Sequence, residues 1–195
     1  MLRTVSTLFM IFLFSTLVQA DYDSANAALK AGDYEIAFNE FQSLAEAGNA
    51  EAQNKIGMMY QRGIGIPQDP AEALKWYRRA ADDGYTFAQY NLGAMYQKGI
   101  CIQQDSPEAL KWYRRAAEQG VTEAQYNLGI MYFSGDGIPK DIMQAYTWID
   151  VAALGGNERA QDSRDLIESE MSPEQIEEAR KLAKEFWQMY GYKEL

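Results

Sequence analysis

Apolar and polar residues alternate along most of this chain with the period of an α-helix. Residues 69–82 carry an apolar stripe at positions i, i+3, i+4 and i+7: Ala73, Trp76, Tyr77 and Ala80. Such a stripe covers one face of a helix. Residues 50–62 place apolar side chains at the same spacing: Ile56, Met59 and Tyr60. The pattern therefore predicts two consecutive amphipathic helices.

The residues that flank these stretches are typical of helix ends. Asp69 can cap the second helix, because its carboxylate can accept a free backbone N–H, and Pro70 suits the first helical turn. Gly84 is suited to the left-handed conformation that ends many helices. The connection between the two helices contains Gly63 and Gly65, which we expect to supply backbone angles that other residues avoid.

The helix pair recurs every 36 residues, and such a repeat determines the architecture of the whole chain. Three copies stay in register through several invariant series, of which the clearest are Gly57, Gly93 and Gly129; Tyr60, Tyr96 and Tyr132; and Trp76, Trp112 and Trp148. We expect the tryptophans to lie in the core. Gly57 and the pair Ala80–Ala81 should allow two helix backbones to approach closely. The three repeats span residues 50–156, divided at about 50–85, 86–121 and 122–157.

Weaker copies of the pattern flank these repeats. Five residues lie 36 positions before their counterparts in the first repeat: Asp33, Ala37, Phe41, Ala45 and Gly48. They predict an N-terminal helix pair within residues 21–49. At the other end, Ser172 precedes a proline and a glutamine in the arrangement of a capping box. Residues 157–195 are therefore expected to form an atypical helix pair that caps the stack.

The recurring GxGxxxD loop and WY–AA helix resemble the Sel1-like repeat family. Two stretches carry the resemblance most clearly, namely AEAQNKIGMMYQRGIGIPQDPAEALKWYRRAADDG and AQYNLGAMYQKGICIQQDSPEALKWYRRAAEQG. The resemblance implies an all-α fold, a right-handed α/α solenoid of about five tetratricopeptide-like pairs. It also implies an adaptor that assembles protein complexes in the cell envelope or in host interaction, with no shared catalytic residues.

Two residues depart from the repeat. Cys101 stands where the other loops have a second glycine, so its loop should be slightly strained or differently shaped. Ile149 replaces the tyrosine of the earlier copies. As the only cysteine, Cys101 cannot form an internal disulfide. Either it forms a mixed disulfide or a dimer, or it is an inert, partly buried thiol.

The sequence offers little chemistry for catalysis. It contains no histidine, which excludes Ser-His-Asp and Cys-His arrangements and removes the commonest metal ligand. Phosphate-binding loops, nucleophile elbows and the Ser-x-x-Lys signature of serine β-lactamases are also missing from the sequence. We therefore expect no enzyme activity, no cofactor and no metal. The alternative is an enzyme that acts on β-lactams or cell-wall material, since some cysteine-rich family members are linked to such activity.

Charge and the first residues suggest where the chain works. The net charge of −10 argues against nucleic acid as a partner. Met1–Ala20 combine a positive start, an apolar run and a cleavage-like end, which is typical of a secretory signal. We expect a periplasmic or secreted protein without stable membrane insertion, and an uncleaved membrane anchor is the alternative. The oligomeric state is not predicted.

A protein or peptide partner is expected on the concave wall, which the first helix of each pair builds in tetratricopeptide-like folds. Positions of that helix that vary between copies should face outward. The candidate binding residues at these positions are Asn54, Met58, Gln61, Phe87, Tyr90, Gln97, Tyr126, Ile130 and Phe133. Tyrosine suits recognition because it combines a large contact area with one hydroxyl. Alternatively, Tyr90 and Tyr126 pack against the neighbouring repeat.

Overall fold

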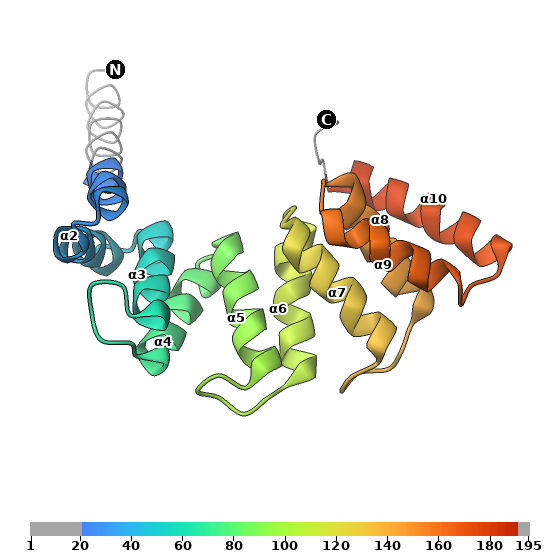
Figure 1. Ribbon diagram of the computed structural model, residues 1–195, viewed down its shortest axis with the longest axis horizontal. Coiled ribbons are helices and arrows are strands. Elements are labelled where there is room, and N and C mark those ends of the chain that lie inside the picture. Colours follow the sequence, from blue (N-terminus) through green and yellow to red (C-terminus); the bar gives the residue numbers. More distant parts are fainter. Residues whose placement is uncertain (1–20, 191–195) are drawn as a thin grey trace, which may run out of the picture. The chain divides into compact units, whose positions relative to one another are not determined.

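The computed structural model describes residues 21–190, which are helical and contain no strand (Figure 1). Residues 21–31 form the first described helical segment. The helices that follow are α2 (Tyr34–Glu46), α3 (Ala50–Arg62), α4 (Pro70–Asp82), α5 (Thr86–Lys98), α6 (Ser106–Glu118), α7 (Thr122–Ser134), α8 (Ile142–Leu154), α9 (Glu158–Glu168) and α10 (Pro173–Met189). The predicted all-α class is confirmed. The expected signal in Met1–Ala20 lies outside the described residues.

The predicted ends of the repeat helices are confirmed. Asp69 caps α4, because its carboxylate Oδ1 accepts the backbone N–H groups of Ala71 at 3.0 Å and Glu72 at 3.1 Å. Asp105 and Asp141 cap α6 and α8 in the same way. These caps satisfy N–H groups that the first helical turn leaves without partners.

The loop between the two helices of a repeat depends on left-handed backbone angles. In the first repeat, the φ angles of Gly63 and Gly65 are 67° and 72°. Cys101 takes the place of the second glycine and keeps the same left-handed shape, with a φ of 58°. A side chain at such an angle costs about 1–2 kcal/mol, so the expectation of a strained loop is confirmed. The residue is exposed rather than partly buried.

The described chain forms two compact units, and residues 21–85 make up the first. Its core consists of buried side chains from residues 21–31, α2 and α3, with Phe41, Ile56 and Met59 at its centre. Helix α3 packs against both α2 and α4. A buried side chain joins successive pairs here, because Gln53 Nε2 on α3 donates to the Ala45 carbonyl of α2 at 3.2 Å.

Residues 86–190 form the second unit. Each helix from α5 to α8 packs against the next, and α10 packs against α8. Gln125 Nε2 donates to the Ala117 carbonyl at 3.1 Å, which repeats the contact made by Gln53. The core of this unit is larger and includes Tyr113, Leu128 and Ile149 among its buried side chains.

In the first two repeats, the helical glycine makes room for an aromatic ring. A Cβ atom on Gly57 would lie 2.8 Å from the Tyr77 ring, and one on Gly93 would lie 2.8 Å from the Tyr113 ring. The ring of Tyr77 is thus the group that needs the space at Gly57, and the close approach of two helix backbones expected at Gly57 and Ala80–Ala81 stays a prediction. The glycine is needed because the aromatic ring of the second helix lies directly on the first.

The tryptophan series is mostly buried, as predicted. Trp112 and Trp148 are 5% and 2% exposed, which confirms their place in the core. Trp76 is only half-buried, and the Arg79 guanidinium lies 5.8 Å from its ring.

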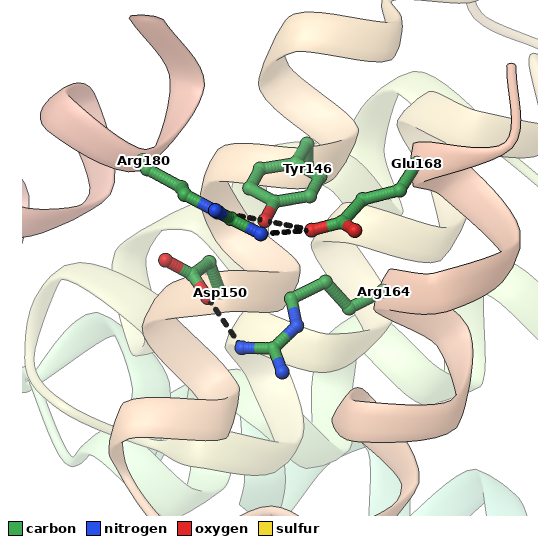
Figure 2. A network of polar contacts seen from close by, with 5 residues as sticks. All are labelled: Tyr146, Asp150, Arg164, Glu168 and Arg180. Carbon is green, nitrogen blue, oxygen red and sulfur yellow. Dashed lines mark hydrogen bonds and ion pairs between the residues drawn. The ribbon is translucent and has the colours of Figure 1, made fainter. Parts of the chain in front are cut away.

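The C-terminal pair is held by caps and by a polar network. Ser172 and Gln175 form the predicted capping box at the start of α10. Figure 2 shows the network that joins α8, α9 and α10 through Tyr146, Glu168 and Arg180. The Tyr146 hydroxyl donates to Glu168 Oε1 at 2.5 Å, and Arg180 donates to the same hydroxyl at 2.9 Å and to the carboxylate at 2.7 Å.

The network shifts the pKa of two of its side chains, Tyr146 and Glu168. Burial and the Glu168 carboxylate raise the pKa of the Tyr146 hydroxyl to about 12. The hydrogen bond from Tyr146, assisted by Arg180, lowers the pKa of Glu168. A second ion pair joins Arg164 on α9 to Asp150 on α8 at 3.1 Å. These contacts fix the last two helices onto the third repeat.

Candidate partner-binding surface

The predicted binding residues lie on the first helices of the repeats. Helix α3 carries three of them in the first unit, and α5 and α7 carry the other six in the second unit. Their exposure separates side chains that can meet a partner from side chains that serve the repeat itself. We use the term first-helix face for the outward side of α5, α7 and α9, defined by Phe87, Tyr90, Tyr126, Ile130, Arg159 and Leu166.

In the first unit, α3 offers less surface than expected. Asn54 is only 8% exposed, so its predicted exposure is wrong. Its amide is shorter than the tyrosine rings at the equivalent positions 90 and 126, and a short side chain is more easily covered by its neighbours. Met58 is half-buried and keeps part of its surface open.

Gln61 and Gln97 form hydrogen bonds within their own repeats. Gln61 Oε1 accepts the Tyr77 hydroxyl at 2.9 Å, and Gln97 Oε1 accepts the Tyr113 hydroxyl at 2.9 Å. Burial raises the pKa of both tyrosines above its usual range. The bond satisfies the only polar atom of a ring that lies in the core. The two glutamines were expected to bind a partner, but their side-chain oxygens bond within their own repeats instead.

The third repeat replaces both members of this pair. Phe133 stands in place of the glutamine, and Ile149 stands in place of the tyrosine. Because donor and acceptor are replaced together, neither is left without a partner. Phe133 is half-buried, with the Lys140 ammonium 4.7 Å from its ring centre. Lys140 also pairs with Glu170 at 2.8 Å.

Tyr90 and Tyr126, the two tyrosines among the predicted binding residues, are both half-buried. The ring of Tyr90 lies 5.8 Å from that of Tyr113 in the same repeat. The hydroxyl of Tyr126 lies 3.3 Å from Ser163 Oγ on α9, and the Arg159 guanidinium lies 4.5 Å from its ring centre. Packing against the neighbouring pair, which was the alternative, is therefore correct for Tyr126.

Large apolar side chains remain exposed on this face. Phe87 on α5 is 54% exposed, and Ile130 on α7 is half-buried. Leu166 on α9 is 58% exposed and was missing from the prediction. The 36-residue step from Ile130 leads directly to Leu166, so the signal was present although the repeat pattern is weak there. The step from Glu123 leads in the same way to Arg159.

Among residues 21–190, no cluster of three or more cysteine, aspartate or glutamate side chains could hold a metal ion. In the same part of the chain, no helix combines the length and apolar character needed to cross a bilayer.

Comparison with known proteins agrees with this organisation. The family model of the Sel1 repeat matches residues 50–85, 86–121 and 122–157. A similar solved structure is c5321, a protective antigen of uropathogenic Escherichia coli displaying an SLR fold. It is 30% identical, with a TM-score of 0.81 over 89% of this chain and 38% of that protein. A Sel1 repeat protein from Oxalobacter formigenes is 31% identical, with a TM-score of 0.71 over 86% of this chain and 68% of the other.

A short match extends to mammals. DAP3-binding cell death enhancer 1 of Mus musculus is 39% identical over 46 residues, which are 24% of this chain and 9% of that protein. This chain thus spans much less than two thirds of c5321 and of the mouse protein. Sel1 repeats generally mediate contacts between proteins, and the scaffold is generally non-enzymatic. Because the three matched segments cover more than half of its residues, this chain belongs to the Sel1 repeat family.

Proposed function

We propose that this protein is an exported, non-catalytic scaffold that holds a protein partner on the first-helix face of its second unit. The observation that carries the proposal is the exposure of large apolar side chains on first helices, with Phe87 at 54% and Leu166 at 58%. Exposed apolar surface of this kind is typical of sites that bind other proteins.

The chemistry around Leu166 suits a mixed apolar and polar partner surface. Ile130 and Leu166 supply apolar contact area. The planar guanidinium of Arg159 lies over the Tyr126 ring, and Arg159 is itself exposed. Aromatic and arginine side chains are the residues that most often dominate binding energy in protein interfaces. A partner that combines an apolar side chain with an acceptor for Arg159 fits this part of the face.

Export is supported by the composition of Met1–Ala20 and by bacterial relatives. Two solved structures that resemble this chain come from the bacteria Escherichia coli and Oxalobacter formigenes. The name of the mouse relative records binding to another protein, which agrees with a role in holding a partner. Fractionation of the cells that produce this protein tests the proposal, since finding the unprocessed chain in the cytoplasm contradicts export.

Site-specific photo-crosslinking tests the binding face. A photoreactive phenylalanine analogue is placed at Phe87 or Leu166, and the matched control carries it at Ile36 on α2, which is also 54% exposed. We expect a discrete adduct with one partner protein from Phe87 and Leu166 in intact cells, and none from Ile36. Adducts of equal yield at all three positions, or at Ile36 alone, contradict the assignment of this face.

A further inference from the structure

The second unit contains a cavity on a side not used by the predicted binding residues. Its volume is about 460 Å³. It is lined by residues of α6, α7, α8 and α10 and by two residues that flank α8 and α10: Arg114, Glu118, Tyr132, Asp141, Gln144, Trp148, Phe186 and Tyr190. We call it the cap cavity, because α10 of the C-terminal pair completes it. None of the nine predicted binding residues lines it.

Aromatic rings form one wall of the cap cavity. The centre of the Trp148 ring lies 5.3 Å from that of Phe186 and 6.4 Å from that of Tyr190. Phe186 and Tyr190 lie 5.9 Å apart, edge to face. The faces of such rings carry partial negative charge and attract cations.

Carboxylates outnumber cationic groups around the cavity. Glu118 and Asp141 contribute two carboxylates, and Arg114 contributes one guanidinium. Arg114 already donates to the Tyr132 hydroxyl and lies over that ring. Glu118 is close enough to Tyr190 that it adds to the effect of burial in raising the pKa of this tyrosine. The cavity therefore favours positive charge over negative charge.

One buried donor in the wall is unsatisfied. In the second repeat, the indole N–H of Trp112 donates to Glu108 Oε1 at 2.9 Å. In the third repeat, Gln144 replaces that glutamate, and Trp148 Nε1 is buried with no hydrogen-bond partner. A buried N–H without an acceptor is costly, so such a group calls for an explanation. An acceptor on a ligand would supply one.

We propose that the cap cavity binds a lysine or arginine side chain of a protein partner. The cationic group lies against the aromatic wall and pairs with Glu118, and a backbone carbonyl of the partner accepts the Trp148 indole N–H. The inference rests on the proposed function only in that the ligand belongs to a protein. It concerns a separate surface, so it can fail while the first-helix face stands.

Nitrogen-15 NMR of the indole groups tests this proposal directly. The protein has four tryptophans, and the Trp148→Phe variant identifies the Trp148 indole resonance. Acetyl-Gly-Lys-Gly-amide is added, and peptides with norleucine or glutamate in place of lysine serve as matched probes. We expect a saturable shift of the Trp148 resonance with the lysine peptide alone. No shift, an equal shift with norleucine, or a shift with glutamate overturns the proposal.

A charge substitution provides the second measurement. Glu118→Gln should weaken binding of the lysine peptide by about five-fold, given the strengths of exposed ion pairs and cation–π contacts. Glu158→Gln, which changes an exposed carboxylate on α9, is the matched control and should leave binding unchanged. Unchanged binding by a folded Glu118→Gln variant contradicts the proposal. Neither measurement depends on Phe87 or Leu166, so the two proposals are tested separately.

Discussion

The second and third repeats share a backbone plan but hold their two helices together differently. In the second repeat, the Tyr113 ring lies on Gly93, and its hydroxyl is satisfied by Gln97. In the third repeat, Ile149 lies on Gly129, where a Cβ atom would come within 2.7 Å of its side chain. Glycine is needed in both cases, although the side chain that covers it changes from polar aromatic to aliphatic.

The polar side chains of the two repeats also have different hydrogen-bond partners. Trp112 is satisfied within its own repeat by Glu108, whereas Trp148 is not. Leu110 of the second repeat corresponds to Tyr146 of the third, which joins Glu168 and Arg180 of the C-terminal pair. At these two positions, the second repeat satisfies the Trp112 indole within itself, whereas the third repeat bonds to the C-terminal pair through Tyr146.

Converting the second repeat into the third should have the largest effect on stability. Tyr113→Ile removes a buried ring and leaves Gln97 without its donor, so we expect a loss of about 2–3 kcal/mol in the free energy of unfolding. Adding Gln97→Phe, which recreates the pair of the third repeat, should restore at least half of that loss. Chemical denaturation of both single variants and the double variant measures the coupling. Losses that simply add would show that the two positions are independent.

Disrupting the cap network should have a smaller, pH-dependent effect. The pKa of Glu168 is lowered in the folded state. Its contribution is therefore present at neutral pH and lost as the pH falls below the ordinary carboxylate range near 4. Glu168→Gln should lower the free energy of unfolding by no more than about 1 kcal/mol at pH 7, because the group is partly solvated.

The pH profile of that variant is the decisive measurement. The difference between Glu168→Gln and the unaltered protein should shrink as the pH falls through and below 4, when both carry a neutral side chain at position 168. Glu158→Gln, which removes an exposed carboxylate from α9, serves as the control for the loss of a surface charge. A difference that stays constant with pH would show that the charge of Glu168 is irrelevant.

Relaxing the strained loop of the second repeat should give the smallest effect. Cys101→Gly copies Gly137, which has a φ of 73° in the third repeat. We expect a gain of about 0.5 kcal/mol, because glycine relieves the left-handed strain but adds freedom to the unfolded chain. Thermal unfolding measures the gain, and Cys101→Val should instead lower stability. An equal response to both substitutions would argue against backbone strain.

Much of the fold could be predicted from the sequence because the repeat displays each signal three times. Asp69 and Gly84 mark the ends of the second helix, and their copies mark the ends of α6 and α8. The predicted limits of α3 agree with Ala50–Arg62. Ser172 and Gln175 identified the capping box of α10 without help from the repeat.

The binding surface was harder to predict, because variation between copies does not distinguish exposed residues from internal partners. Gln61 and Gln97 vary to phenylalanine in the third copy, and we therefore placed them outside. Each glutamine accepts a hydrogen bond from the tyrosine sixteen residues further along the chain. The third copy replaces the glutamine and the tyrosine together, by Phe133 and Ile149. Tyr146 was not predicted to have a special role, because its partners Glu168 and Arg180 come from a segment that lies outside the period.

The hydrogen bond between successive helix pairs has a consequence for how such chains change length. Gln53 and Gln125 each bind a main-chain oxygen of the preceding pair, and every amino acid provides that oxygen. Duplicating or deleting a 36-residue repeat upstream of Thr122 therefore leaves this hydrogen bond between successive pairs intact. The third repeat is different, because Tyr146 forms hydrogen bonds with particular side chains of the last two helices. Additional 36-residue repeats are therefore tolerated best on the N-terminal side of the third repeat.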